Sequence, residues 1–260
     1  MAEQLLVFGD DGSSGADVAW LWVNEQVWPG WRIEVVAVEP AIGVRPDPGA
    51  AVLREWSPES PREYLRGGVA VAQLTARADP RAVLGARADA DLLVIGARGR
   101  GLFKSLRLGS AAEWLLQCPP APLLIARTGR PVRRVLVCVD GSVHAWRAVQ
   151  TVAELPVLAD AEVTVLTVGY RGGEVPDDVA GAVDLLTPLA RAVDVVEMTQ
   201  DPVDLFYSVR DTVLDMAADR GADLIVMGTR GTGNWSQLRI GSTASAVTRY
   251  ATASVLLAHA

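Results

Sequence analysis

Short apolar runs of strand length alternate along the chain with amphipathic stretches of helical period. In the second half this pattern predicts five strands, which cover 133–140, 161–168, 194–199, 223–228 and 254–259. Helices are predicted between them, up to about residue 155 and over 176–192, 202–221 and 242–252. A proline opens the stretch 202–221 and a glycine closes it, as is typical of a helix. Pro188 should interrupt the stretch 176–192.

The first half repeats this order of elements. Its predicted strands cover 4–9, 32–38, 69–74, 91–96 and 122–126, and its predicted helices cover 14–27, 80–88 and 110–117. Residues 39–68 carry five prolines and four glycines where the second half has a helix, so we expect mostly loop there. Strands that alternate with helices predict βαβ units and a parallel, doubly wound sheet in each half.

Two segments of the first half recur with similar sequences in the second half. "DLLVIGARGRGLFKSLRLGS" at 91–110 returns as "DLIVMGTRGTGNWSQLRIGS" at 223–242, and "DGSSGA" at 11–16 returns as "DGSVHA" at 140–145. A displacement of this size is that of one small domain rather than of a solenoid repeat. The sequence therefore predicts two similar domains, 1–130 and 131–260, joined by the Gly/Pro/Arg segment "RTGRPVRR".

Composition narrows the classes of function. The formal net charge of −7 argues against a nucleic-acid binder that works by neutralising phosphates. No apolar run approaches the length of a membrane span, and "MAEQLLVFGDD" is too short and too acidic for a secretory signal. Cys118 and Cys138 suggest neither a metal site nor a disulfide framework, so we expect a cytoplasmic protein. His144 and His259 leave little material for metal or base chemistry, and we expect no metal site or catalytic residue.

The special residues are predicted to meet at one place. In doubly wound sheets, ligands bind beyond the carboxyl ends of the strands, where the strand order reverses. Asp140 ends the first strand of the second half, and Gly228 ends the fourth. We expect Gly228 to let the backbone approach a ligand, and Gly231 to allow a left-handed turn or a second close approach. Gly241 precedes the last helix, whose N–H groups would complete a phosphate site.

This arrangement differs from two familiar phosphate motifs. A Walker loop would continue with Gly-Lys-Ser/Thr, and a dinucleotide fingerprint would follow the first strand rather than the fourth. The spacing Gly, two residues, Gly, nine residues, Gly-Ser instead resembles that of the universal stress protein family, and "VDGS" after a first strand fits it too. Both halves carry the spacing, so nearly the whole chain is similar to the tandem type of that family.

The resemblance implies a fold and a ligand. The fold would be α/β, with two Rossmann-like (adenine nucleotide alpha hydrolase-like) domains, each a five-stranded parallel sheet, paired as a pseudo-two-fold intramolecular dimer. The ligand would be ATP, with or without Mg²⁺, in a protein with a regulatory role in stress response. Carried over by position, the nucleotide-binding residues would be Asp140, Gly141, Ser142, Val168, Gly228, Arg230, Gly231, Gly241, Ser242 and Thr243 in the second half, and Asp11, Gly12, Val38, Gly96, Arg98, Gly99, Gly109 and Ser110 in the first.

Within this set, the aspartates would lie beside the nucleoside. Val38 and Val168 would offer backbone atoms to the adenine, and the glycines with their serines would hold the phosphates and ribose. Helix capping alone is the alternative for Asp11 and Asp140, and exposure to solvent is the alternative for Arg98 and Arg230. The spacer residues are expected to pack or line the loop rather than do chemistry: Phe103, Lys104 and Trp235.

The two sites are not expected to be equal. Asp10 adds negative charge beside the first site, which should weaken phosphate binding there unless Mg²⁺ or a basic neighbour offsets it. Glu113 in the first turn of the following helix would compete with a phosphate. The second half continues instead with Thr243, Ala244 and Ser245, which offer hydroxyl donors. We therefore expect the second site to be the stronger.

Other functions and contacts stay open at this stage. One alternative is a slow adenine-nucleotide hydrolase, and another is a partner-binding module without a ligand. The expected partner is an adenine nucleotide, with neither nucleic acid nor membrane, and tandem chains could also form a homodimer. The apolar strands 122–126 and 254–259 are expected to pair within the chain. The tryptophans that could form an assembly patch, or simply belong to the core, are Trp20, Trp22, Trp28 and Trp31.

Overall fold

The computed structural model consists of two compact units, Met1–Arg130 and Pro131–Ala260. Each is considered by itself, so the pairing of 122–126 with 254–259 stays a prediction. The residues that the structure describes are 3–39, 54–55, 62, 65, 69, 71–99, 108–170, 176, 178–200, 208–231 and 240–260. Most of 39–68, the start of the helix predicted at 202 and the spacer residues Phe103, Lys104 and Trp235 lie outside this part of the chain.

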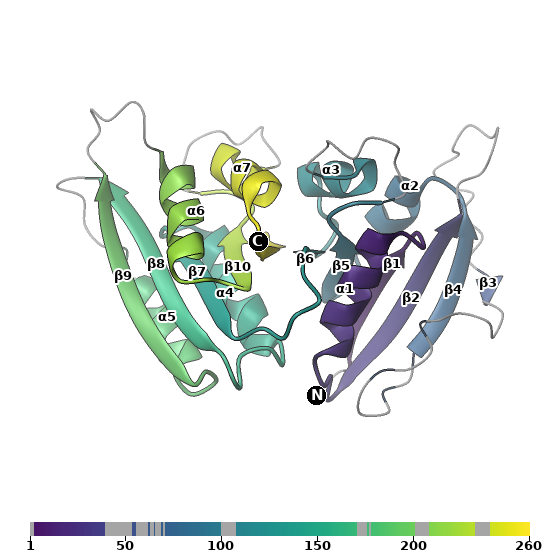
Figure 1. Cartoon of the computed structure of the whole chain (residues 1–260), viewed down its shortest axis with the longest axis horizontal. Helices are drawn as coiled ribbons and strands as arrows, with labels where there is room; N and C mark the ends of the chain where they lie inside the picture. Colours follow the sequence, from purple (N-terminus) through teal and green to yellow (C-terminus); the bar gives the residue numbers. More distant parts are fainter. Residues whose placement is uncertain are drawn as a thin grey trace. The chain divides into compact units, whose positions relative to one another are not determined.

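The second half is a five-stranded parallel sheet with helices on both faces (Figure 1). Its strands are β7 (Arg134–Val139), β8 (Glu162–Tyr170), β9 (Ala192–Gln200), β10 (Leu224–Gly228) and β11 (Ser254–Ala258), in the spatial order β11-β10-β7-β8-β9. Its helices are α4 (Val143–Glu154), α5 (Asp178–Leu186), α6 (Val209–Asp219) and α7 (Ser242–Tyr250). The helix α5 ends before Pro188, as predicted. In Figure 1, α6 and α7 lie in front of this sheet, and α4 and α5 lie behind it.

The first half has the same core order with one addition. Its strands β1 (Gln4–Asp10), β2 (Trp31–Glu39), β4 (Val71–Arg77), β5 (Leu92–Gly96) and β6 (Leu123–Ala126) are ordered β4-β2-β1-β5-β6. Its helices are α1 (Ser14–Asn24), α2 (Pro80–Gly85) and α3 (Ser110–Gln117). A two-residue strand, β3 (Arg54–Glu55), runs antiparallel along β4. The sheet of the first half is therefore mixed and not purely parallel as expected, because residues 54–55 pair with its edge.

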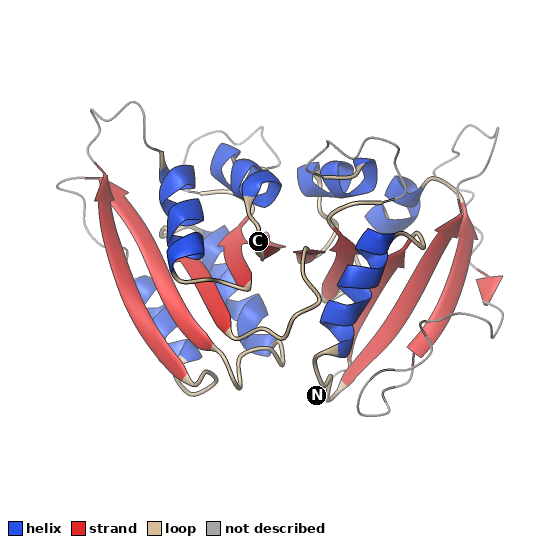
Figure 2. Ribbon diagram, in the orientation of Figure 1, coloured by secondary structure: helices blue, strands red, loops and turns tan. Residues whose placement is uncertain are grey.

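Alternate residues of β1 face opposite layers of the first half. Phe8 packs against Trp20 of α1 with ring centroids 5.2 Å apart. A Cβ atom at the next residue, Gly9, would lie 2.8 Å from Leu84 of α2. The sheet is thus sandwiched between helices, as Figure 2 shows for both halves. This confirms the doubly wound α/β fold predicted from the alternation of strands and helices, and the Rossmann-like fold that the family resemblance implied.

The four tryptophans of the first half belong to its core. Trp20, Trp22, Trp28 and Trp31 are all at most 6% exposed. Trp28 packs against both Trp22 and Trp31, and its indole N–H donates to the carbonyl of Val23 at 2.8 Å. These side chains therefore offer no surface patch for assembly, and the alternative that they are core is confirmed.

The strand order reverses beside the first strand of each half. β1 pairs with β2 on one side and β5 on the other, and β7 pairs likewise with β8 and β10. The residues that follow β7 and β10 therefore emerge side by side, as do those that follow β1 and β5. No helix among the described residues is long and apolar enough to cross a membrane.

Candidate functional site

The loop between β7 and α4 is fixed by its own hydrogen bonds. Gly141 has a φ of +79°, a left-handed conformation that favours glycine. The amide of Ser142 donates to Oδ1 of Asp140 at 3.1 Å, and Oγ of Ser142 accepts from the amide of Ala145 at 3.0 Å. Ser142 is thus the N-cap of α4. Its hydroxyl also donates to the carbonyl of Arg230 at 3.1 Å, which ties this loop to the loop after β10.

Gly228 is required by the packing of the protein. A Cβ atom there would lie 2.6 Å from the amide nitrogen of Ala145, so only glycine lets the start of α4 approach the end of β10. Gly96 has the same role in the first half, where a Cβ atom would lie 2.4 Å from the carbonyl oxygen of Gly15. The backbone that each glycine was expected to bring toward a ligand therefore approaches a helix of its own half.

Gly231 lies directly against the carboxylate of Asp140. A Cβ atom at Gly231 would be 2.5 Å from Oδ2 of Asp140. The left-handed turn considered for Gly231 is absent, since the described glycines with positive φ are Gly12, Gly30, Gly141 and Gly221. The second possibility, a close approach, is what the structure has, and the group that approaches is an acidic side chain of the same site.

The N-terminus of α7 completes this part of the site. Gly241 is its N-cap, with an ordinary φ of −71° and no side chain to offer to the first turn. The amide of Gly241 donates to the carbonyl of Thr229 at 2.7 Å, which holds the helix start beside the end of β10. A Cβ atom at Gly241 would lie 3.5 Å from Cα of Arg230 and 3.9 Å from the amide nitrogen of Gly231. The N–H groups of the first turn therefore stand next to Gly231, at the positive end of the helix dipole.

Ser242, Thr243 and Val168 lie around the same edge of the second half. Ser242 is exposed and Thr243 half-buried at the start of α7. Val139 pairs with Thr167 in the sheet. Because side chains alternate along a strand, Val168 faces the same side as Asp140, and it is half-buried there.

The first half closes its two loops in the same way. The amide of Ser13 donates to Oδ1 of Asp11 at 3.0 Å, and the hydroxyl of Ser13 donates to the carbonyl of Arg98 at 3.2 Å. A Cβ atom at Gly99 would lie 2.4 Å from Oδ2 of Asp11. Gly12 is left-handed with a φ of +65°. The repeated sequence thus gives the same backbone and side-chain geometry around Asp11 and Asp140.

The remaining residues of the first set take equivalent places. Gly109 is the N-cap of α3, with Ser110 exposed as the first residue of that helix. The amide of Gly109 donates to the carbonyl of Ala97 at 2.9 Å, the counterpart of the bond from Gly241 to Thr229. Val38, near the end of β2, is 5% exposed.

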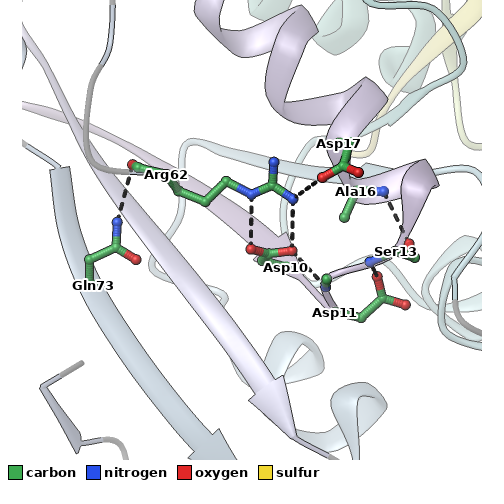
Figure 3. Close-up of polar contacts among 8 residues, drawn as sticks. Asp10, Asp11, Ser13, Ala16, Asp17, Arg62 and Gln73 are labelled. Atoms are coloured by element: carbon green, nitrogen blue, oxygen red, sulfur yellow. Dashed lines mark hydrogen bonds and ion pairs between the residues drawn. The ribbon is translucent and has the colours of Figure 1, made fainter. Parts of the chain in front are cut away.

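Arg62 distinguishes the first half, and the sequence analysis missed it. Its Nε donates to Oδ2 of Asp10 at 3.0 Å, and its NH2 donates to Oδ1 of Asp10 at 3.3 Å and to Oδ1 of Asp17 at 2.7 Å (Figure 3). The guanidinium also lies over the rings of Phe8 and Trp20, 5.8 and 6.0 Å from their centroids. Burial lowers the pKa of Arg62, but the hydrogen bonds and charges of Asp10 and Asp17 raise it overall. Arg62 is therefore a buried cation between two carboxylates.

The charge of Asp10 consequently has a basic neighbour. Asp10 was expected to weaken phosphate binding only without Mg²⁺ or a basic neighbour, and Arg62 is such a neighbour. At the equivalent positions the second half has Val139 and Trp146, and Trp146 packs beside α5, 3.3 Å from where a Cβ atom of Gly181 would lie. Two acids in place of two apolar residues indicate that a cation is needed. The sequence alone does not say which arginine of 39–68 supplies it.

A histidine pair lies beside Arg230 in the second half. The amide of Ala260 donates to Nδ1 of His144 at 2.9 Å, so this ring nitrogen acts as an acceptor. Burial and then the charge of Arg230 lower the pKa of His144, with a further lowering from His259 and an opposing effect of Asp140. The pKa of His259 is lowered by burial, Arg230 and Arg147. Both histidines are therefore held in the neutral form at physiological pH.

A family model described as the universal stress protein family matches residues 6–127 and, separately, residues 131–259. The chain belongs to the universal stress protein family. Its two halves are two family domains in tandem. Universal stress protein Slr1230 from Synechocystis sp. (strain ATCC 27184 / PCC 6803 / Kazusa) is 27% identical over 175 residues, or 65% of this chain. The match spans 58% of that relative's own length.

Solved structures share the fold across the whole chain. A universal stress protein from Archaeoglobus fulgidus DSM 4304 is 18% identical, with a TM-score of 0.64 over 99% of this chain and 96% of that one. A functionally unknown protein from Pseudomonas aeruginosa PAO1 is also 18% identical, with a TM-score of 0.62 over 99% of this chain and 93% of that one. At these identities the likeness establishes the tandem α/β fold and nothing about the ligand.

Proposed function

We propose that this universal stress protein binds an adenine nucleotide, ATP foremost, in each half, and that the nucleotide gives it a regulatory role in stress response. The observation that carries the proposal is the meeting of Asp140, Gly231 and Gly241 at the carboxyl ends of β7 and β10. Asp11, Gly99 and Gly109 repeat this arrangement in the first half. Two copies of one unusual geometry in one chain favour a common ligand over two unrelated turns.

The phosphates would lie at the N-terminus of α7. Gly241 leaves the first-turn N–H groups without a side-chain cap, and a helix N-terminus with free N–H groups favours an anion. The absence of a side chain at Gly241 and Gly231 keeps the space beside these groups open. Ser242 would offer its hydroxyl to the phosphates, and Arg230 would offer a positive charge at the start of the loop after β10.

The nucleoside would lie toward β8. In this proposal the carboxylate of Asp140 accepts hydrogen bonds from the ribose hydroxyls, and backbone atoms of Val168 recognise the adenine edge. Asp140 is well placed for this, since its Oδ1 is already oriented by the amide of Ser142. Its position also argues against phosphate contact, because two negative groups would repel each other there.

Within this proposal the site binds the nucleotide and is not assigned a turnover. Among the described residues, no group of three or more His, Cys, Asp or Glu side chains could hold a metal. Any Mg²⁺ would therefore arrive with the phosphates. A universal stress protein has been solved in complex with cAMP, which places an adenine nucleotide in one member of the family. We rest the proposal on the glycine geometry, since that protein covers half of this chain with a TM-score of 0.37.

The cellular setting belongs to the same proposal. Cys118 and Cys138 are both free thiols, which suits the reducing cytoplasm. We propose that the protein works there, with the nucleotide as its signal and other proteins as the readers of that signal.

The direct test is to identify the ligand that the purified protein carries. The native chain is freed of loosely bound solutes and denatured, and the released small molecules are separated and identified by mass spectrometry. ATP at up to two molecules per chain supports the proposal. ADP or AMP alone points to slow hydrolysis. Protein that releases no nucleotide, and that fails to bind added ATP in calorimetry, overturns the proposal in favour of a partner-binding module.

A further inference from the structure

A cavity of about 340 Å³ lies in the second half, far from the glycine loops. It is lined where β7, β8 and β9 begin and where α6 ends, so it opens at the amino ends of the strands rather than at their carboxyl ends. Its volume falls within the range of small-molecule sites. Neither the glycine spacing nor the proposed nucleotide site uses this end of the sheet.

Two charges of the cavity wall have no ion-pair partner among the described residues. Arg220 is paired with Asp194 at 2.8 Å, and Glu162 is paired with Arg191. These pairs leave a cation, Arg134, and an anion, Asp219. Arg134 donates one N–H to the carbonyl of Arg220 at 3.2 Å, and no described residue accepts from its other N–H groups. The cavity thus presents one positive and one negative side chain without an ion-pair partner, and both are exposed to solvent.

The floor of the cavity includes the hydroxyl of Thr164. The residue is 8% exposed, but its oxygen is not among the side-chain atoms that are sealed from solvent without a partner. Thr164 pairs with Leu136 on β7 and Asp194 on β9, so it faces the same side of the sheet as Arg134 and Glu162. Its hydroxyl is therefore open to the cavity and can form a hydrogen bond with a ligand there.

In the first half, side chains of the protein itself fill the equivalent place. The register of the strands aligns Leu5 with Arg134 and Glu34 with Thr164. Arg87 aligns with Asp219, because each stands four residues before the aspartate that directly precedes the next strand, Asp91 or Asp223. Arg87 donates to Glu34 at 2.7 Å, and its guanidinium is also held by Asp89. Leu5, Glu34 and Arg87 are each at most 9% exposed. All three positions that close the first half thus carry different side chains in the second, and there they surround the cavity.

We propose that this cavity is a binding site for a small zwitterion of the amino-acid type. The ligand's ammonium group binds Asp219, where the carbonyl end of α6 adds partial negative charge. Its carboxylate binds the fork of Arg134, a geometry that guanidinium groups favour. One of its polar atoms reaches the hydroxyl of Thr164. A ligand with only one charge leaves either Asp219 or Arg134 unpaired.

The test compares three probes with the same carbon chain on the full-length protein. L-norvaline carries both charges, butylamine only the positive one, and pentanoate only the negative one. Binding is followed by NMR of the backbone amides of Thr164 and Ala222, both of which line the cavity. We expect L-norvaline to shift these amides, and the other two probes to bind weaker by about tenfold or more, because each loses a charged hydrogen bond.

Variants identify the side chains that act. Thr164→Val and Asp219→Asn should each weaken L-norvaline binding by about fivefold or more. Asp215→Asn, which removes a carboxylate of the same helix outside the cavity, should leave it unchanged. The pair Thr164→Glu with Asp219→Arg recreates the plug of the first half and should abolish binding. Circular dichroism and ATP calorimetry verify that each variant is folded, and they report on the glycine site independently.

Three results would overturn the proposal. The first is an absence of shifts with L-norvaline at concentrations that saturate ordinary small-molecule sites. The second is butylamine or pentanoate binding as well as L-norvaline, which would show that one of the two charges is not used. The third is undiminished L-norvaline binding by the plugged variant.

Discussion

Glycines of one motif can have quite different physical roles. Gly228 and Gly241 belong to the same repeated spacing, yet a Cβ atom would meet backbone at 2.6 Å at the first and nothing closer than 3.5 Å at the second. The first glycine is required by the fold. The second is compatible with a side chain, and under the proposed function the open space beside it is taken by the ligand.

This difference predicts that alanine at the two positions lowers stability by different amounts. Gly228→Ala should lower the free energy of unfolding of the second half by about 2 kcal/mol, since α4 must move away from β10. Gly241→Ala should lower it by no more than about 1 kcal/mol, because its φ of −71° suits any residue and only the preference for glycine over alanine at an N-cap is lost. Urea unfolding of both variants, followed through probes in the second half, measures the two values. Equal losses would contradict the separation of roles.

A larger side chain at Gly241 tests the nucleotide proposal at the same residue. Gly241→Val should leave the fold intact and remove one of two ATP sites, because the side chain enters the space beside the amide of Gly231. Ser242→Ala should cost about 1 kcal/mol of binding, since only one hydroxyl is lost. Titration calorimetry gives the stoichiometry and affinity.

The first half supplies the control for this experiment. Gly109→Val should remove the other site and spare the second. A folded Gly241→Val protein that still bound two ATP molecules with unchanged affinity would show that the phosphates do not lie at α7.

The two halves use different contacts at one place beside the sheet. In the second half Trp146 packs beside α5, and in the first half Arg62 lies between Asp10 and Asp17. An apolar contact in one half thus stands where the other half has an ion-pair cluster on an aromatic floor. Arg62 and Asp10 are both buried, so each would remain a buried charge if it lost the other, whereas the side chain of Asp17 is 61% exposed.

Removing the central cation should therefore destabilise the first half. Arg62→Met keeps much of the side-chain volume and should cost about 2 kcal/mol, because Asp10 loses its partner while its side chain remains 11% exposed. Adding Asp10→Val, the residue found at 139, should recover part of that loss. Thermal unfolding of the single and double variants gives the coupling between the two side chains. Additive losses would show that the ion pair contributes nothing of its own.

The sequence predicted regular elements better than contacts from irregular segments. Alternation of apolar runs and amphipathic stretches located the strands at 91–96 and 223–228, because strands buried on both faces are apolar throughout. The repeated text likewise predicted that Asp11 and Asp140 occupy equivalent places. β3 and Arg62 escaped prediction, since two residues of strand have no periodicity and an arginine among prolines looks solvated. The contact made by Gly228 was not predicted either, because the spacing of a motif identifies a glycine but not the group that packs against it.

The two halves of the molecule differ in how their stability depends on pH. Both histidines, His144 and His259, lie in the second half, and their pKa values are lowered there by burial and by the charge of Arg230. The unfolded chain therefore binds more protons than the folded one as the pH falls below about 6.5. The stability of the second half should be complete above that pH and should decline below it.

The first half should stay insensitive in the same window. The pKa values of Asp79 and Asp89 are lowered below 3.8, chiefly by hydrogen bonds from Arg81 and Arg87, so their contributions are lost only in stronger acid. Hydrogen exchange from pH 7.5 to 5.5 should show faster opening in β7 and β10 than in β1 and β5, after correction for the intrinsic rate. His144→Gln with His259→Gln should remove most of that difference. A parallel response of both halves would rule the histidines out as its cause.

The strand β3 has a consequence for the behaviour of the chain at high concentration. By covering β4, it hides backbone groups along the outer edge of the first sheet. Among the described residues no strand covers β9 in the same way, and Val195 and Met198 on it are each 38% exposed. The exposed carboxylate of Glu197 makes that edge unattractive to a second strand of like charge, while Asp194 is paired with Arg220. If the protein forms fibrillar aggregates, β9 is where strand-by-strand growth would begin.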